Sequence, residues 1–285
     1  MKIHSKKDIY YYYRILFFSF IPLILHGIIK NGLLLQSETN SSLIIFKPLI
    51  FWGISFLLGI MSDLIILREK RINKYLIYLT IFYMTSSINT PIWLFILGNI
   101  LLIIMLTLDK NVINKIALTS LLVVLGNYLL KCNNYGNLIE TSGKYLFSFT
   151  DGIFLRQIGG IATGNFILVI ILLIILLFNI FYKRNVSLWG LLTYIVFFII
   201  IGIVKEPSVA FKALINSTAL FQLVIIAPLN EYSPYNPKGE IAYGLLVGLI
   251  GSLLCFYVSN NVGMLIAIMI LSPLKYFFQK NKLFF

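Results

Sequence analysis

Charged residues are scarce in this sequence, and acidic ones are the scarcer kind. Only 12% of the 285 residues are charged, and 10 Asp and Glu stand against 23 Lys and Arg. A soluble domain usually carries about 25% charged residues. Uncharged apolar runs, such as 167–181, 189–204 and 241–258, would leave a surface too apolar for water. A soluble enzyme and a soluble DNA-binding module are therefore excluded, and the sequence predicts an integral membrane protein.

Cysteine and histidine are nearly absent. Cys132 and Cys255 are far apart, and neither has a neighbour at metal-ligand spacing. His4 lies in a polar stretch and His26 in an apolar one, so surface or packing roles are expected for them. The sequence also lacks a Walker loop and a catalytic triad or acid pair, so neither hydrolysis nor ATP-driven transport has visible machinery. If the protein is an enzyme, a cofactor must supply the chemistry.

The net charge of +13 is explained by membrane topology. Basic residues gather in short loops, as expected if they hold those loops against an anionic leaflet, and no aromatic and basic patch suggests nucleic acid. The expected partner of this charge is the lipid bilayer. The first apolar run, 10–29, lacks a small-residue cleavage site and is expected to be a retained helix.

The apolar runs and their interruptions predict an all-α, polytopic membrane protein with about ten transmembrane helices. The third run is short for a full span. The candidate helices are 10–29, 43–67, 74–86, 91–107, 112–130, 165–182, 187–204, 209–227, 241–258 and 263–279.

Lys and Arg counts fix the expected orientation of this path. One side receives fifteen of these residues, from Lys2 to Lys282, whereas Lys30, Lys131, Lys144, Arg156 and Lys205 fall on the other. The richer side is expected to be cytoplasmic, so both termini should be cytoplasmic. The long polar segment from Lys131 to Asn165 is then outside.

Two breaks suggest an internal repeat. Ser86–Pro91 follows the third predicted helix, and Ala227–Pro237 follows the eighth. We therefore expect two inverted five-helix halves, 1–131 and 165–285, separated by an outer loop, 132–164. Paired Pro-interrupted elements often build a central binding site. Ordinary surface loops are the alternative interpretation.

Charges inside a bilayer are functional candidates by default. Asp63 lies about one turn from Arg68 and Glu69, which favours a solvated, salt-bridged helix end over a buried proton or ion relay. Lys47 and Lys212 lie near helix starts and are expected to extend their ammonium groups towards the interface.

Two glycine-containing segments carry the strongest functional signal. Phe154–Asn165 places Gly159, Gly160 and Gly164 just before a long apolar helix. Glycines there permit close backbone approach to something flat or phosphorylated, and a helix N-terminus adds a positive dipole end. Tight helix packing through small residues is the alternative. The second segment, Ser233–Gly248, is rich in proline and glycine.

Together these segments resemble one family of membrane proteins, RnfD of the Rnf electron-transport complex and its relative NqrB of the sodium-pumping NADH:quinone reductase. The family's Ser-Pro-x-x-Pro-Lys/Arg-Gly run and the following Tyr/Phe-Gly-x-x-x-Gly are matched by Ser233, Pro234, Pro237, Lys238, Gly239, Tyr243, Gly244 and Gly248. Ile158, Gly159, Gly160 and Gly164 are similar to its Ile-Gly-Gly-x-x-x-Gly run, although Asn165 stands where Glu is usual. Leu79, Thr80, Pro91 and Trp93 resemble a third stretch. The resemblance spans most of the chain at low identity.

The resemblance implies a flavoprotein that passes electrons through the membrane, with FMN esterified to a threonine of Ser-Gly-Ala-Thr on the outer face. Here that segment reads Glu140–Tyr145, in which Lys144 and Tyr145 replace the alanine and the acceptor threonine. Thr141, Ser142 or Thr150 could serve as acceptor instead, or the covalent flavin could be lost. The outer position of this segment agrees with the charge count.

The resemblance also implies a noncovalent flavin, riboflavin or another, within the helix bundle. Asn89, Thr90, Asn230 and Ser233 at the two breaks could hydrogen-bond an isoalloxazine edge, with Trp93 or Tyr232 stacked nearby. The glycine segments, including Lys238 and Gly239, complete the candidate cofactor-binding set.

The sequence is therefore interpreted as an RnfD-like chain of the bacterial cell membrane. It would work with other membrane, flavin and iron–sulfur subunits and couple electron flow to sodium or proton movement. A flavin-free transporter or channel for a small solute is the alternative, since paired broken helices also suit alternating access or a selectivity filter. A redox-silent structural subunit is the third interpretation.

Overall fold

Every regular element in the described part of the chain is helical, which confirms the predicted all-α class. The computed structural model describes residues 6–34, 43–68, 73–108, 112–132, 159–204, 207, 213–259 and 261–280. Four of its helices are long and apolar enough to cross a membrane. These are Tyr10–Gly32, Phe46–Ile65, Arg184–Val204 and Pro237–Tyr257.

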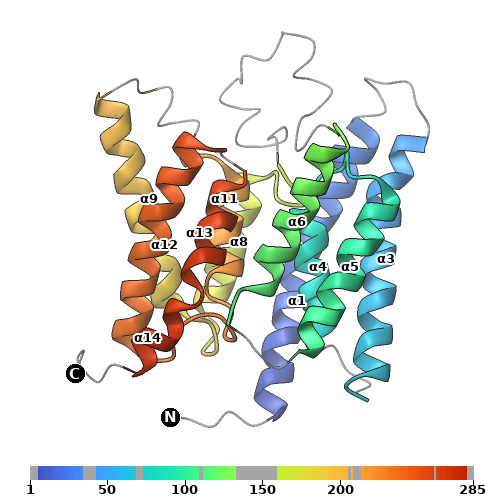
Figure 1. Ribbon diagram of the computed structural model, residues 1–285, viewed down its shortest axis with the longest axis horizontal. Coiled ribbons are helices and arrows are strands. Elements are labelled where there is room, and N and C mark those ends of the chain that lie inside the picture. The colour runs from blue at the N-terminus through green and yellow to red at the C-terminus, as the bar shows by residue number, and fades with distance from the viewer. Residues whose placement is uncertain are drawn as a thin grey trace.

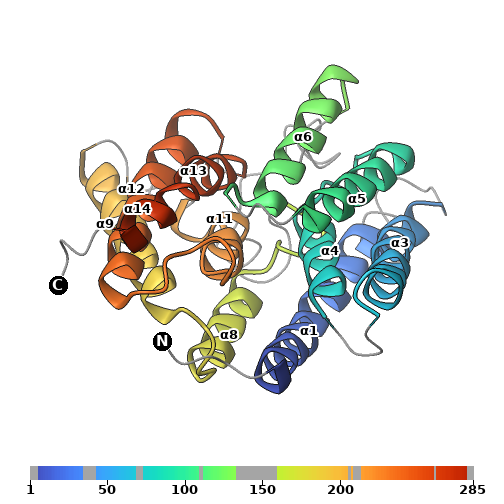
Figure 2. The same cartoon turned by 60° about the horizontal axis from the view of Figure 1, so that its bottom comes forward.

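The helices form two groups that lie side by side (Figures 1 and 2). The first group contains α1 (Lys6–Ile28) with its π-helical extension η1 (Ile29–Leu34), α3 (Leu43–Ile65), α4 (Lys74–Thr85), α5 (Ile92–Thr107) and α6 (Lys115–Leu129). The second contains α8 (Phe166–Leu177), α9 (Arg184–Val204), α11 (Ser217–Phe221) continuing as the π-helix η3 (Gln222–Ile226), α12 (Pro237–Tyr257), α13 (Gly263–Leu271) and α14 (Leu274–Lys280). The end of the bundle where α1 begins and α14 ends is called the terminal end below.

Each group has one short helix that is buried throughout. In α4 all residues from Tyr75 to Thr85 are buried, and in α11 and η3 all residues from Ser217 to Ile226 are buried. At 1.5 Å per residue, the 12 residues of α4 extend only about 18 Å, short of the roughly 30 Å hydrocarbon core. The prediction that the third helix is short is confirmed.

The long helices expose apolar side chains outward. On α9, Leu192, Ile195, Ile199 and Ile203 are exposed, whereas Tyr194 and Phe198 are buried. A surface of this kind is suited to lipid rather than to water, because lipid tails are as apolar as these side chains. The burial pattern is compatible with a membrane protein.

Local sequence explains where helix ends differ from their predicted positions. The helix expected over 165–182 ends at Leu177, because a turn follows in which the Asn179 side chain accepts a hydrogen bond from the Phe181 N–H at 2.9 Å. The last predicted helix is divided into α13 and α14 at Pro273, which has no N–H to continue the hydrogen-bond ladder. Helix α12 begins earlier than expected, with Pro237 at its first turn, where a proline is well tolerated.

Helices α9 and α12 pack closely through glycines. A side chain added at Gly244 would come within 2.6 Å of the Val186 carbonyl oxygen, and one added at Gly248 within 2.4 Å of the Gly190 carbonyl oxygen. Small residues let two backbones approach in a way that larger ones prevent. The Tyr-Gly-x-x-x-Gly run on which the family resemblance rests is thus a helix-packing surface.

Gly248→Ala is expected to destabilise the protein by about 1–3 kcal/mol, because the new methyl group would overlap backbone atoms of α9. Gly53→Ala is the matched control, since a side chain added at Gly53 of α3 would meet open space. It should leave stability unchanged or raise it slightly through helix propensity. Thermal unfolding of the detergent-solubilised proteins measures both effects. Equal melting temperatures for the two variants would contradict this account of the packing.

Candidate functional site at the junction of the two helix groups

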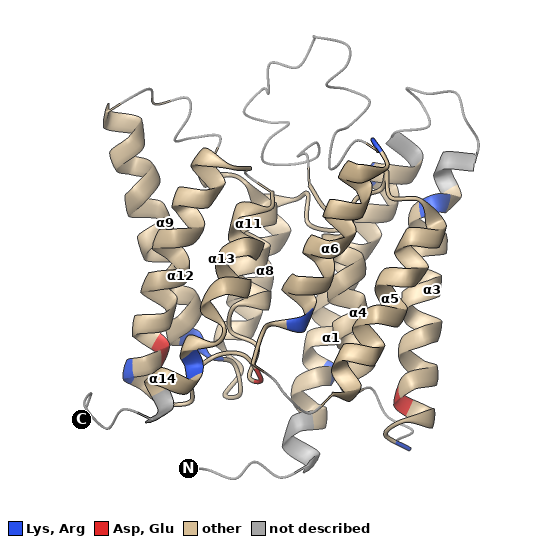
Figure 3. Cartoon of the chain, viewed as in Figure 1, with Lys and Arg blue, Asp and Glu red and all other residues tan. Residues whose placement is uncertain are grey.

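Lys and Arg gather at the terminal end of the bundle (Figure 3). Lys74 begins α4, Lys115 begins α6, Lys183 precedes α9, and Lys275 lies in α14. Lys115, Lys183 and Lys275 are buried, which is unusual for lysine, whereas Lys74 is not. Their common neighbourhood is the segment between η3 and α12, residues 227–236, which we call the junction loop.

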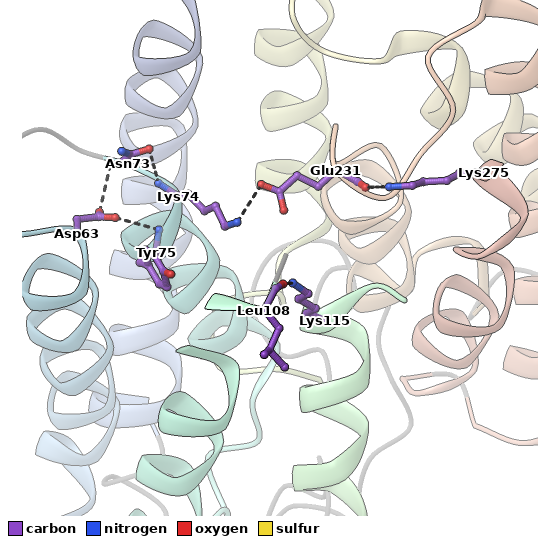
Figure 4. A network of polar contacts seen from close by, with 8 residues as sticks. All are labelled: Asp63, Asn73, Lys74, Tyr75, Leu108, Lys115, Glu231 and Lys275. Carbon is purple, nitrogen blue, oxygen red and sulfur yellow. Dashed lines mark hydrogen bonds and ion pairs between the residues drawn. The ribbon is translucent and has the colours of Figure 1, made fainter. Parts of the chain in front are cut away.

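Lysines from three elements hold the junction loop. Lys183 Nζ donates to the Ser233 carbonyl oxygen at 2.8 Å and to the Asn230 carbonyl oxygen at 3.3 Å. Lys275 Nζ donates to the Glu231 carbonyl oxygen. The Glu231 carboxylate forms an ion pair with Lys74 at 3.4 Å, the one ion pair among the described residues (Figure 4). The loop is therefore fastened to its own group through carbonyls and to the first group through a carboxylate.

Asp63 caps the start of α4. Its carboxylate oxygens accept hydrogen bonds from the N–H groups of Asn73, Tyr75 and Leu76, at 3.2, 3.1 and 3.3 Å. The side chain is buried, so the expected solvated pairing with Arg68 is replaced by helix capping. This satisfies N–H groups that have no partner within the helix.

Lys47 and Lys212 are the two lysines that were expected to extend their ammonium groups towards the interface. Lys47 lies in the first turns of α3, with its ammonium 5.6 Å from the centre of the Phe51 ring. Lys212 lies outside the described residues.

Tyrosines lie next to the junction loop, at the boundary between the groups. The Tyr78 and Tyr232 ring centres are 6.4 Å apart, and Tyr78 hydrogen-bonds the Tyr13 side chain. All three side chains are buried. Helix α1, helix α4 and the junction loop thus meet through phenol groups near the Glu231 carboxylate.

Burial lowers the pKa of the Lys183 ammonium to about 7, with a further lowering by Lys275 and an opposing effect of Glu240. The ammonium also lies over the Tyr235 ring, 4.2 Å from its centre. A charge this deeply buried is costly, and the two loop carbonyls offset only part of that cost.

A second junction lies at the other end of α4. The N–H groups of Ile161 and Ala162 donate to the carbonyl oxygens of Ser86 at 2.9 Å and Met84 at 3.2 Å. The side chain of Asn31, at the end of α1, donates to the Ile161 carbonyl oxygen at 2.8 Å. The segment 159–163 therefore satisfies backbone carbonyls that the end of α4 leaves open.

Hydroxyl pairs surround this second junction. Thr163 and Thr218 are 2.9 Å apart between hydroxyl oxygens, and Thr85 and Ser120 are 3.2 Å apart. All four side chains are buried. The first pair joins the segment before α8 to α11, and the second joins α4 to α6, so both provide neutral polar groups in the interior.

The predicted glycine site is a packing site in the structure. A side chain at Gly160 would come within 2.3 Å of the Met84 carbonyl oxygen, and one at Gly159 within 2.0 Å of the Thr218 hydroxyl. Gly164 is buried directly before Asn165, whose side chain accepts from the Leu168 N–H at 3.0 Å and caps α8. The close approach inferred from these glycines is real, and its partner is the chain itself.

The first predicted break, residues 86–91, is held by local bonds. Thr90 Oγ1 accepts from Asn127 Nδ2 at 2.8 Å, and the Asn89 N–H donates to Ser87 Oγ at 3.2 Å. Trp93 lies on the outward side of α5 and is 54% exposed, so it does not stack inside the bundle.

The second break is the junction loop. Asn230 Nδ2 donates to the Phe181 carbonyl oxygen at 3.4 Å, and Ser233 Oγ donates to the Leu229 carbonyl oxygen at 2.9 Å. Lys238 is exposed, and Gly239 is buried against Asn236 and Pro234. This break lies at the terminal end, whereas 86–91 follows the far end of α4, so the structure does not bring their predicted site residues together.

These bonds bear on the predicted flavin site. Thr90, Asn230 and Ser233 each make a hydrogen bond within the chain, and each keeps a further donor or acceptor that a ligand could use. The flavin site at the breaks stays a prediction. Thr141, Ser142 and Thr150 lie outside the described residues.

Sequence reasoning missed Glu231, Lys74 and Asn114. Asn114 caps α6, donates through Nδ2 to the Ile226 carbonyl oxygen at 3.2 Å, and donates through its N–H to Ser272 Oγ at 2.9 Å. A single acidic residue inside a proline-rich break was the signal that could have identified Glu231. Asn114 carried no such signal, because its partners lie in the second group.

No protein family and no curated protein sequence matches the chain. The fold and the contacts described above are thus the basis on which a function can be proposed.

Gly160→Ala is expected to destabilise the protein by about 1–3 kcal/mol even when no flavin is bound, because the methyl group would overlap the backbone of Met84 and Thr85. Thermal unfolding of flavin-free protein in detergent tests this, again with Gly53→Ala as control. If Gly160→Ala unfolds like the wild type and only flavin retention changes, Gly160 serves a ligand rather than packing.

Stability is expected to rise with pH above about 7. The ordinary pKa of lysine is 10.5, and that of Lys183 is about 7 in the folded protein, so the unfolded chain holds this proton over a range in which the folded chain has released it. The contribution is complete above pH 10.5 and is lost as the pH falls through about 7. Lys183→Met should flatten the melting temperature between pH 7 and 9, whereas Lys238→Met, at an exposed lysine, should retain the wild-type slope.

Proposed function

We propose that this chain is a membrane-embedded component of an ion-translocating electron-transport complex, similar to RnfD. The proposal includes ten membrane elements in two inverted halves. The proposal rests on two grounds, the sequence resemblance and the arrangement of the helices. It also makes sodium or proton coupling a property of the whole assembly rather than of this chain alone.

The paired short helices carry this proposal. Each group contains five apolar segments in order, and the third segment of each is the buried short one, α4 or α11 with η3. Helix α1 begins at the terminal end, whereas α8 follows the segment 159–163, which Asn31 of η1 binds at the opposite end. This first pair of corresponding segments therefore runs in opposite directions, the arrangement expected of inverted repeats.

The proposed orientation places the terminal end in the cytoplasm of a bacterial cell. Its support is the cluster of lysines at helix starts on that end, together with the positive-inside rule. Segment 132–164 is then on the outer side.

The proposed flavin is carried by that outer segment, near Thr141 and Ser142, rather than between the helices. The family resemblance supports this choice, and so does the exposure of Trp93, which removes one predicted stacking partner from the bundle interior. Such a flavin would supply one- and two-electron chemistry. The helices would bind and orient the outer segment and exclude water from the path across the membrane.

The full-length, tagged chain, purified in detergent and freed of partner proteins, should show flavin absorbance and keep its fluorescence through denaturing electrophoresis. Loss of fluorescence in one of Thr141→Ala, Ser142→Ala or Thr150→Ala would assign the acceptor. Trp93→Ala is the control, because this residue lies on the outward side of α5 and should not alter flavin content. Flavin released on denaturation would place the cofactor within the bundle, and a colourless protein would overturn the flavin role.

A channel for a small uncharged solute is the second candidate. The observation in its favour is the set of buried neutral hydroxyls, Thr85 with Ser120 and Thr163 with Thr218, in the interior near the second junction. Such groups can exchange hydrogen bonds with a passing solute without attracting ions. Colourless protein that accelerates swelling of proteoliposomes in urea or glycerol would favour this candidate, and colourless protein without transport would favour a redox-silent structural role in an assembly.

A further inference from the structure

The junction loop is fastened in two chemically different ways. Within its own group, Lys183 and Lys275 bind the carbonyl oxygens of Asn230, Glu231 and Ser233. Those bonds do not involve the Glu231 side chain. The Glu231 carboxylate reaches across to Lys74, at the start of α4. Losing the ion pair would therefore leave the loop attached to its own group.

The ion pair is weaker than the contacts around it. The side chains of Lys74 and Glu231 are each 21% exposed, so the pair keeps some contact with solvent. Solvent screening lowers the contribution of such an ion pair to stability. By contrast, the neutral bonds of Asn114 to Ile226 and Ser272 are fully buried and also join the two groups at this end. The Lys74–Glu231 ion pair is thus the more easily broken connection between the groups, and the Asn114 hydrogen bonds are the more persistent one.

Behind the ion pair lies the group of buried tyrosines. Tyr78 is four residues after Lys74 on α4, and Tyr232 directly follows Glu231. The rings of Tyr78 and Tyr232 are buried and lie 6.4 Å apart between centres.

We propose that the Lys74–Glu231 ion pair is the latch of a gate between the two helix groups at the terminal end. Breaking the pair separates α4 from the junction loop, while the Asn114 contacts act as the hinge. The separation admits water to the interior at Tyr78 and Tyr232. Because the gate is defined by contacts between the groups, it does not depend on a flavin.

Cysteine accessibility tests the gate. Tyr78→Cys is introduced into the full chain after replacement of Cys132 and Cys255 by serine or alanine, and the protein is placed in lipid nanodiscs. A small, charged methanethiosulfonate reagent should label the cysteine slowly with the ion pair intact. Glu231→Gln should raise the labelling rate by about two- to fivefold, since a solvent-screened ion pair shifts the balance between closed and open forms only modestly. Lys74→Gln should act in the same way, and the exchanged pair Lys74→Glu with Glu231→Lys should restore slow labelling.

Glu240→Gln is the matched control. Like Glu231, Glu240 is an acidic residue near the start of α12. Its carboxylate accepts a hydrogen bond from Asn185 Nδ2 at 3.0 Å, so its partner lies within the second group. Its removal should not change the labelling rate. Equal rates for wild type and Glu231→Gln, or an equal increase with Glu240→Gln, would overturn the proposal. Tyr232→Cys is the second reporter if Tyr78→Cys does not yield folded protein, and melting temperatures establish that each variant is folded.

Discussion

Two short helices end inside the bundle, and the need to satisfy their terminal backbone groups shapes the rest of the structure. A helix leaves N–H groups open at its start and carbonyls open at its end, and an apolar interior offers no water to satisfy them. Asp63 serves the start of α4, and the N–H groups of Ile161 and Ala162 serve its end. Asn216 caps α11, and Asn114 binds the last carbonyl of η3.

Several interior polar groups of the described chain serve these helix ends. Asn114 also joins the two helix groups, because it lies at the start of α6 and binds the end of η3. The lysines follow the same logic at the terminal end, because a loop between two helices exposes carbonyls that an ammonium group can bind. Polar residues that would suggest a ligand site in isolation are thus part of the framework that supports the short helices.

The sequence was informative about the helices and less so about the site. Long apolar runs predict the helices α3, α5, α9 and α12, because the length and composition of such a run are enough to indicate a membrane-spanning helix. The end of α8 depended on one side-chain bond of Asn179, which competes with the helix and is invisible to a count of apolar residues. The division at Pro273 was readable, since proline cannot continue a helix.

The glycine segments show where prediction from sequence reaches its limit. Gly159 and Gly160 indicated that something approaches the backbone closely, which is correct, but only the fold reveals that it is the end of α4 and Thr218. Glu231 and Lys74 lie far apart along the chain, so their pairing follows from the arrangement of the two groups. The outer segment with Thr141 and Ser142 stays a prediction.

The contacts at the two ends of α4 have a consequence for biosynthesis. A ribosome releases the partners of α4 in a fixed order, with Asp63 first, then Ile161 and Ala162, and much later Glu231. Before residue 162 emerges, the last carbonyls of α4 have no partner from this segment. The end of α4 therefore gains these partners only after α5 and α6 have been made, and the Glu231 ion pair at its start comes later still.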